Sequence, residues 1–420
     1  MTGTIIFTTL YIILIIKLFT NKNEAIEAYI IFSLISPNLR IGQYQISFEI
    51  AAFLPVLFVL FLKRTKVFAI FNKSVDRQYL WLYFFIYIVA TLVSTLKYEG
   101  NINLIPIFGY FRAICIIYML QYIMKDNPSI ILDNILTPVL FINFVFSVIQ
   151  LSAPSSVNIF YEFYYKDSMT PLKETLKLGY FNRAYGTFGT PVSLGILAVF
   201  AFAIYIGFIS EKKQIRHLYL KLVMSIIIGL MSLSKTAILG IPLTLIVYFL
   251  LALFGIIKVK NKKALFIPIL IIPIGLIVIY FLIKQGTFIL WYIDYLFKPF
   301  EAFITRYDSS TGILANTYLI IRDNLLIGVG SKSFENVFSG DSMYIGLMYS
   351  TGILGTSLYI VIILISTIRN IKLKHVTAVL CAIAIILAGF AAPIQLNILS
   401  VSLLAYIFSK SEMDLNIQKN

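Results

Sequence analysis

The sequence predicts an all-α integral membrane protein, a multi-span helical bundle of about 12–13 transmembrane helices. Three observations favour this fold class. Of the 420 residues, 60% are hydrophobic and only 13% are charged, whereas a typical soluble domain has about 25% charged residues. The mean hydropathy is +0.91. Apolar runs of the length that a membrane helix needs recur along the chain, so we expect one polytopic domain over residues 1–420.

The spans can be placed from the apolar runs and the charges between them. We expect them at about 4–20, 25–37, 46–62, 79–96, 104–124, 134–153, 191–209, 218–232, 236–257, 264–283, 342–368, 376–391 and 394–409. The run at 25–37 is short and begins beside Glu24 and Glu27, so a re-entrant or interfacial element is the alternative there. Residues 4–20 are interpreted as the first span, because no basic segment precedes them and no small-residue cleavage site follows.

The distribution of charge predicts the side of the membrane on which each loop lies. The formal net charge is +15, and most basic clusters fall in loops of one side. These clusters are Lys63, Arg64, Lys66, Lys73 and Arg77; Lys212, Lys213 and Arg216; Lys258, Lys260, Lys262 and Lys263; and Arg369, Lys372 and Lys374. If that side is the cytoplasm, 21 of the 34 basic residues lie inside and 12 outside. The positive charge is then explained by topology, without a nucleic-acid partner.

Two external loops, at about 154–190 and 284–341, are longer than a simple connection between spans requires. The cytoplasmic loops are short, so we expect any chemistry on the external face. Both histidines, His217 and His375, fall in cytoplasmic loops, which excludes external histidine catalysis and a histidine-ligated external metal. The chain also lacks a glycine-rich phosphate-binding loop of the ATPase type. We expect no cofactor and no metal.

Arg183 begins a polar, glycine-rich segment at the end of the first external loop. Gly186 and Gly189 permit close backbone approach, and Pro191 suits the first turn of the helix that follows. The N-terminus of a helix attracts anions, and a neighbouring arginine can bind phosphate through two hydrogen bonds. The alternative is an interface arginine beside an ordinary loop-to-helix turn.

Three further ionisable residues stand at or within the predicted spans. Lys235 lies in a tight external turn between two spans, where a cation opposes the general charge distribution. Arg112 lies near the middle of the span 104–124, and Glu49 lies about one turn inside its own span. Charges at such depth are costly unless they are paired or face an aqueous cavity. Arg112 and Glu49 therefore either form a structural ion pair or line a substrate cavity.

A second polar segment follows Arg322 in the second external loop. Gly328 and Gly330 mark a tight turn, and Asp341 stands at the start of a helix that contains Gly352. Asp341 is either a functional carboxylate or simply the N-cap of that helix.

These segments resemble the O-antigen ligase/polymerase superfamily and, within it, the Wzy-type polysaccharide polymerases. Residues 183–191 (RAYGTFGTP) are similar to a family pattern R-x-x-G-x-F-x-x-P that enters a helix. Residues 232–237 (SLSKTA) are similar to S-x-S-R-x-A, with lysine in place of the usual arginine. Residues 326–330 (LIGVG), followed by 341–344 (DSMY) and 352–355 (GILG), resemble a third family block. The ligases typically carry histidine where this chain has Asp341, which favours the polymerase branch.

The resemblance implies a GT-C-like fold in the bacterial cytoplasmic membrane, with the active face periplasmic or extracellular. It implies metal-independent transfer of oligosaccharide repeat units carried on undecaprenyl pyrophosphate, which builds an O-antigen, capsule or exopolysaccharide. Besides the lipid bilayer, it implies a chain-length regulator and a flippase of the same pathway as partners. Under this interpretation the pyrophosphate is bound by Arg183, Lys235, Arg112 and Arg322. Asp341 is the first choice for the carboxylate that activates the acceptor hydroxyl, and Glu49 is the second.

Besides a non-catalytic membrane scaffold for an assembly machine, two alternatives stay open from the sequence. One is an O-antigen ligase. The other is a polysaccharide flippase or transporter, which would be expected to scatter buried charges through two matched halves of the bundle. Here the polar residues concentrate in two loops on one face, and no matched halves are evident.

Overall fold

The computed structural model describes residues 2–41, 44–62, 75–99, 102–153, 160, 177–178, 181–261, 264, 314–334, 337 and 342–417. Within these residues the protein is almost entirely helical. The first half of the chain forms α1 (Thr2–Thr20), α2 (Lys22–Ile35), α3 (Phe48–Leu62), α4 (Val75–Lys97), α5 (Leu104–Ile123) and α6 (Pro128–Ser152). The second half forms α9 (Pro191–Ser210), α10 (Leu218–Ser232), α11 (Lys235–Leu253), α15 (Ala315–Asp323), α16 (Met343–Lys372), α17 (Val376–Gly389), the 3-10 turn η3 (Ile394–Leu396) and α18 (Ile398–Ile417).

Two small antiparallel hairpins accompany the helices. They pair β1 (Leu39–Ile41) with β2 (Tyr44–Ile46), and β3 (Lys177–Leu178) with β4 (Phe181–Asn182). Both join segments on either side of short turns, and Leu39 of β1 packs against the hydrophobic core.

The described helices have the composition and surface of an integral membrane protein. Seven of them, α1, α4, α5, α6, α9, α11 and α16, are long and apolar enough to cross a membrane. Large apolar side chains face outward over much of the surface, among them Phe61 (71% exposed) and Leu104 (69% exposed). A soluble monomer rarely exposes so much contiguous apolar surface, whereas a bilayer favours it. The predicted all-α membrane bundle is confirmed at this level.

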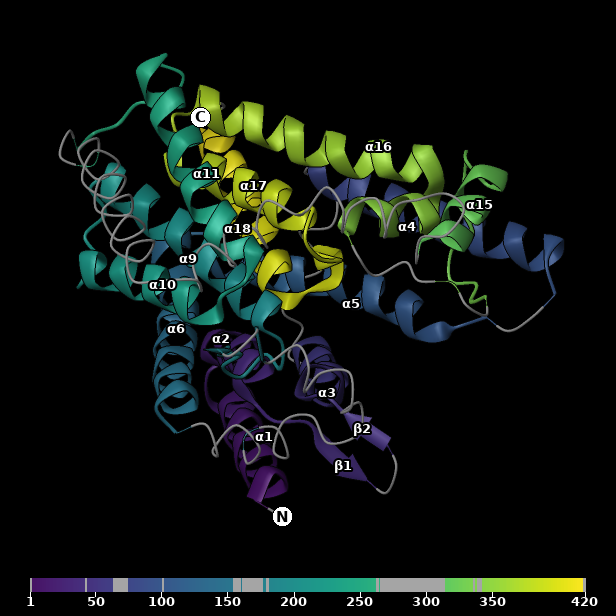
Figure 1. Ribbon diagram of the computed structural model, residues 1–420, viewed down its shortest axis with the longest axis horizontal. Coiled ribbons are helices and arrows are strands. Elements are labelled where there is room, and N and C mark those ends of the chain that lie inside the picture. Colours follow the sequence, from purple (N-terminus) through teal and green to yellow (C-terminus); the bar gives the residue numbers. More distant parts are fainter. Residues whose placement is uncertain are drawn as a thin grey trace.

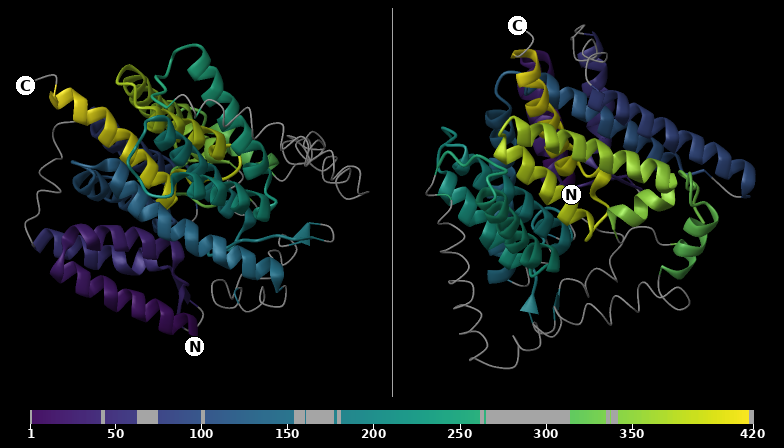
Figure 2. Two further views of the ribbon diagram at one scale, coloured as in Figure 1. Left: turned by 90° about the vertical axis from the view of Figure 1, so that its left-hand side faces the viewer. Right: turned by 90° about the horizontal axis from the view of Figure 1, so that it is seen from above.

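The bundle is built around α9, whose side chains are almost all buried against α10, α11 and α17. Helix α18 packs beside α5 and α17, and α16 lies along α4. Helices α1, α2 and α3 form a group that meets the rest of the bundle chiefly where α2 packs against α6. Figures 1 and 2 show this group below the other helices, with α9, α10 and α11 at one end of the long axis and α15 at the opposite end.

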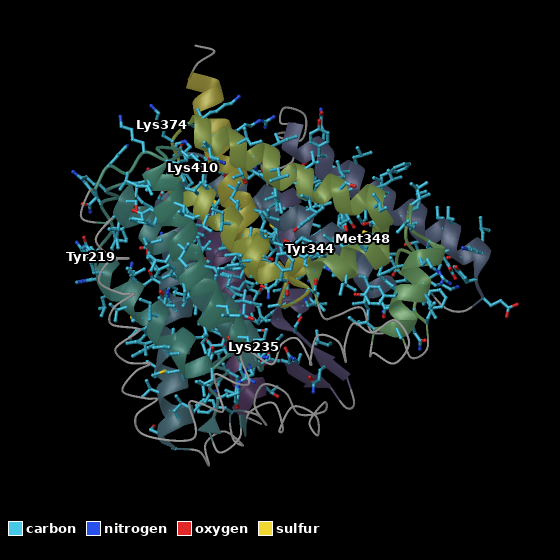
Figure 3. All side chains as sticks on the ribbon, turned by 45° about the horizontal axis from the view of Figure 1, so that its top comes forward. Tyr219, Lys235, Tyr344, Met348, Lys374 and Lys410 are labelled. Carbon is cyan, nitrogen blue, oxygen red and sulfur yellow. The ribbon has the colours of Figure 1, made fainter. Side chains whose placement is uncertain are left out.

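The helix ends lie in two regions of the bundle, and polar contacts identify the helices that meet in each region. One group joins Leu34 to Thr187, Ser232 to Arg183, and Ile386 to Tyr344. The other joins Glu27 to Asn134, Ser210 to Lys260, and Ile407 to Asn370. Figure 3 shows one residue of the first region, Lys235, in the lower half of the view, and Lys374 and Lys410 together near its top. We call these regions the Lys235 end and the Lys374 end.

The described helices lie close to the spans that the sequence predicts. The run 25–37 corresponds to α2, whose 14 residues extend about 21 Å, less than the hydrocarbon thickness of a bilayer. The predicted span 264–283 lies outside the described residues, apart from Ala264. Most of the two predicted external loops also lies outside them.

Helix α16 departs from the continuous span that the sequence predicts, because its backbone is interrupted at Gly352. This residue has φ 59° and ψ −160°, a conformation that favours glycine. A Cβ atom on Gly352 would lie 2.5 Å from the carbonyl carbon of Leu326, so the neighbouring chain also requires glycine here. Helix α16 therefore consists of two half-helices that meet at a break.

The backbone groups released at this break are bonded to the segment that follows α15. In a continuous helix the amides of Ile353 and Leu354 would donate to the carbonyls of Tyr349 and Ser350. Instead, four hydrogen bonds cross to the neighbouring segment: Ile353 N to Leu325 O (2.8 Å), Leu354 N to Leu326 O (3.2 Å), Val329 N to Tyr349 O (2.9 Å) and Gly330 N to Ser350 O (2.7 Å). The backbone groups of both these pairs thus have new partners, as a non-helical backbone inside a membrane requires.

Candidate functional site

The two polar segments around Arg183 and Lys235 meet at the Lys235 end. The amide of Ala184 donates to the carbonyl of Met231 at 3.0 Å. The Nε of Arg183, which is half-buried, donates to the carbonyl of Ser232 at 3.1 Å. Lys235 begins α11 three residues later. Two cations that are about 50 positions apart in sequence are thus carried by segments in direct contact.

Two helix N-termini lie beside these cations. Helix α9 begins at Pro191, and the hydroxyl of Thr190 caps it by accepting from the amide of Ser193 at 3.2 Å. Helix α11 is capped by Ser234, whose hydroxyl accepts from the amide of Ala237 at 3.2 Å. The helix N-terminus carries a partial positive charge and free amide donors, so each start favours an anion.

Gly195 brings these two helix starts together. A Cβ atom at this position of α9 would fall 1.9 Å from the Oγ of Ser234, the capping atom of α11. Any larger residue would push the two helices apart. The Lys235 end therefore combines two helix N-termini with the cations Arg183 and Lys235, an arrangement suited to a polyanion such as a diphosphate.

Two buried amide side chains of α6 hold the backbone that carries Arg183. The Oε1 of Gln150 accepts from the amides of Tyr185 and Gly186, both at 3.0 Å, and its Nε2 donates to the carbonyl of Gly186 at 3.1 Å. The Oδ1 of Asn143 accepts from the amide of Thr187 at 2.8 Å. Buried backbone groups need such partners, so these side chains fix the loop conformation.

Asn143 and Gln150 were missed by the reasoning from sequence, although a signal for them exists. With Ser147 they stand at positions i, i+4 and i+7 of an apolar span, and all three are fully buried. A polar face within a membrane helix indicates an internal partner. Here the partner is the loop after Asn182.

The buried Arg112 side chain and the half-buried Glu49 side chain form an ion pair with 2.9 Å between Nη2 and Oε1. The ion pair that one alternative predicted is therefore present, but one polar atom of the pair lacks a hydrogen-bond partner. The Oε1 of Glu49 is held by this ion pair, whereas the Nε of Arg112 is buried and has no hydrogen-bond partner within the part of the chain that the structure describes. Arg112 thus keeps an unused donor in a membrane helix, where such a group is costly.

Helix α2 connects this ion pair to the Arg183 loop. The hydroxyl of Tyr29 donates to the backbone carbonyl of Glu49 at 3.1 Å. Five residues further along, the carbonyl of Leu34 accepts from the hydroxyl of Thr187 at 2.9 Å. At about 1.5 Å per residue, the two contacts are about 7.5 Å apart along the axis of α2. Helix α2 therefore contacts both the start of α3, which carries Glu49, and the Arg183 loop.

Arg322 is not brought to this group. It lies on α15, its side chain is 73% exposed, and its Nε pairs with Asp323 at 3.3 Å. Figure 1 shows α15 at the opposite end of the long axis from α9, α10 and α11. Its role in binding pyrophosphate stays a prediction, and Arg322 does not lie near Arg183 and Lys235 to support it.

Asp341 lies outside the described residues, so its predicted catalytic role stays a prediction. The helix that follows is capped by another residue: the hydroxyl of Ser342 accepts from the amide of Tyr344 at 3.1 Å. The alternative that Asp341 is the N-cap of α16 is therefore wrong.

A second buried ion pair, which the sequence analysis did not identify, lies towards the Lys374 end. The Nζ of Lys221 donates to both carboxylate oxygens of Asp133 at 2.8 Å. Thr137 donates to the same carboxylate at 3.0 Å, and the ring of Tyr205 lies 5.7 Å from the Nζ of Lys221. Because every charged atom of this pair has partners, we interpret it as structural. The predicted span began at residue 134, so Asp133 was assigned to a loop and its pairing with Lys221 was not expected.

Within the described ranges, no group of three or more His, Cys, Asp or Glu side chains is placed to hold a metal ion. The candidate site thus consists of protein charges alone among the described residues, and they are Arg183, Lys235, Arg112 and Glu49.

No protein-family model matches this chain, and no significant match to a curated protein was found.

Proposed function

We propose that this protein polymerises oligosaccharide repeat units carried on undecaprenyl pyrophosphate into a surface polysaccharide. The observation that carries the proposal is the contact between the Arg183 loop and the start of α11, because it gathers two cations and two helix N-termini at one end of a membrane bundle. In the proposal, Arg183, Lys235 and Arg112 bind the diphosphate. Arg322 is left out because of its distance along the bundle.

The proposed reaction is the transfer of a glycosyl group. The oxygen of an acceptor sugar hydroxyl attacks the anomeric carbon, and the bond from that carbon to the diphosphate oxygen breaks. A carboxylate takes the hydroxyl proton, and the diphosphate leaves on its lipid. Fixed cations lower the barrier by stabilising the charge that develops on the leaving group, so the reaction needs neither nucleotide nor metal. The carboxylate is Asp341 or Glu49.

The proposed orientation places the Lys235 end outside the cell. The Lys374 end carries the basic segments that include Lys212, Arg216, Lys260, Arg369 and Lys374, and such clusters are retained in the cytoplasm. An impermeant thiol reagent tests the orientation in intact cells. In a Cys115→Ala/Cys381→Ala background, we expect labelling of Lys235→Cys and none of Lys374→Cys. The reverse pattern contradicts the proposal.

A cellular assay tests the function. We expect loss of the chromosomal gene to remove long-chain glycan on a gel, and the wild-type protein to restore it. Arg183→Ala should fail to restore it at equal protein abundance. Arg322→Ala is the matched control, because it removes an arginine that lies far from the candidate site, and it should restore long chains. Equal rescue by both variants overturns the proposed site.

A flippase is the second candidate, and the break in α16 favours it because interrupted helices are common in transporters. Against it, the backbone groups released at the break are bonded to the segment after α15 rather than left for a substrate. The leaflet in which lipid-linked repeats accumulate separates the two functions, because loss of either one removes long chains from the gel. Loss of a flippase leaves lipid-linked repeats in the inner leaflet, whereas loss of the proposed polymerase leaves them unpolymerised in the outer leaflet.

A further inference from the structure

A cavity of about 840 Å³ lies between α3, α4 and α5, outside the group of charges described above. Its size falls within the range of about 300–1,000 Å³ that small-molecule sites occupy. The residues that matter for its chemistry are Leu54, Phe58 and Phe61 of α3, Trp81 of α4, and Phe111 and Cys115 of α5.

The cavity is apolar and reaches the lipid-facing surface. Leu54, Phe58 and Phe61 are 58%, 62% and 71% exposed, so its α3 wall borders the bilayer. The ring nitrogen of Trp81 already donates to the hydroxyl of Tyr118 at 3.0 Å. Nothing else among the lining side chains named above is strongly polar, so the cavity offers water little to bind and suits a hydrocarbon chain.

The cavity adjoins the Arg112–Glu49 pair on two helices. On α5, Arg112 lies between the lining residues Phe111 and Cys115. On α3, Glu49 precedes the lining residue Leu54 by five positions, or about 7.5 Å along the helix. The buried Nε of Arg112 has no hydrogen-bond partner among the described residues. An unused cationic donor therefore lies next to an apolar chamber, a combination that matches an amphiphile with an anionic head and a hydrocarbon tail.

We infer that this cavity holds the hydrocarbon chain of the lipid-linked substrate, with the phosphate-bearing head towards Arg112. The inference rests on the proposed function for the identity of the substrate, but its chemistry comes from the cavity and the ion pair. An ordinary bilayer chain is the competing occupant. It would enter from the same side, but its zwitterionic head carries no net negative charge to pair with Arg112.

Tryptophan fluorescence gives a direct test, because the chain has two tryptophans and Trp81 lines the cavity. In a Trp291→Phe variant, Trp81 is the single tryptophan. The protein is placed in phosphatidylcholine nanodiscs and titrated with a dibromostearyl phosphate, whose bromine atoms quench tryptophan on contact. We expect saturable quenching. Dibromostearyl phosphocholine should require at least tenfold more lipid for half-saturation.

A matched variant moves the reporter out of the cavity. Phe85 lies one turn along α4 and is 62% exposed to lipid, so Trp81→Phe/Phe85→Trp/Trp291→Phe reports the bulk bilayer. Quenching there should rise linearly without saturation. Filling the cavity by Cys115→Phe should weaken binding about 15-fold if two methylenes are displaced. If that variant does not fold, a competition experiment gives the same information. Unlabelled undecaprenyl phosphate should displace the brominated phosphate, and phosphatidylcholine should not.

Linear quenching of Trp81, equal to that of the reporter at position 85, overturns the inference and assigns the cavity to ordinary bilayer chains. Equal half-saturation for the two head groups overturns the part assigned to Arg112. The assay needs no polymerisation, so its failure is distinct from failure of the proposed function. Saturable binding without chain growth would support the lipid-binding cavity and contradict the proposed polymerase function.

Discussion

Replacing Gln150 by leucine tests how the Arg183 loop is held. The substitution keeps a side chain of similar size but removes three hydrogen bonds, two from the amides of Tyr185 and Gly186 and one to the carbonyl of Gly186. Gln150 is fully buried in α6, so water cannot replace these bonds while the loop stays closed. We therefore expect the loop to open more often, with the helices around it unchanged.

The magnitude follows from the two amides. Leaving a buried donor unsatisfied costs about 1–3 kcal/mol, so two donors cost at least about 2 kcal/mol. If opening of the loop is local, the amides of Tyr185 and Gly186 should exchange with deuterium about 30-fold faster than in the wild type. The Gln150→Glu variant keeps the acceptor oxygen and should exchange more slowly than Gln150→Leu.

Hydrogen–deuterium exchange of peptides covering 183–190 is the assay, and Ser152→Ala is the control. Ser152 is exposed at the same end of α6, and among the described residues its hydroxyl donates only to the carbonyl of Ile149. A thiol-reactive dye measures global unfolding in parallel, since both cysteines, Cys115 and Cys381, are buried. Unchanged exchange in Gln150→Leu would show that the two amides of the loop do not depend on Gln150 and would refute this reasoning.

Three further predictions concern stability and are measured by the same thiol-dye melting assay. Asp133→Ala or Lys221→Met alone should destabilise the protein by about 3–5 kcal/mol, whereas Asp133→Leu/Lys221→Met should be nearly neutral; additive losses would contradict a buried pair. Gly352→Ala should abolish folding, because its Cβ would meet the Leu326 backbone; a normal melting temperature would contradict the break in α16. Arg322→Ala should change stability by less than about 1 kcal/mol, and a larger loss would show that the exposed pair with Asp323 matters.

The membrane bundle could be predicted because its signal is local. A run of about 20 apolar residues specifies a membrane helix without reference to the rest of the chain. The break in α16 could not be predicted in the same way, because a glycine at position 352 is compatible with a continuous helix. What decides it is the segment 325–330, which supplies four replacement hydrogen bonds.

The candidate site shows the same division between local and tertiary information. Arg183 and Lys235 stand out in sequence because they are polar residues at the boundaries of apolar runs. Their proximity depends on a contact between Ala184 and Met231, which no local pattern encodes. Asp133 and Lys221 were overlooked because each lies close to the start of its helix, where a charge is common; only their pairing shows that they are buried.

Reconstitution from purified components tests the central claim most directly. The protein is placed in liposomes with purified undecaprenyl-pyrophosphate-linked repeat units, without nucleotide and with a metal chelator present, and glycan length is followed on a gel. We predict that chains lengthen with time, and that Arg183→Ala or Lys235→Ala slows growth at least about 100-fold, equivalent to about 2.7 kcal/mol of lost stabilisation of the leaving diphosphate. Repeat units that remain single with the folded wild-type protein would contradict the account.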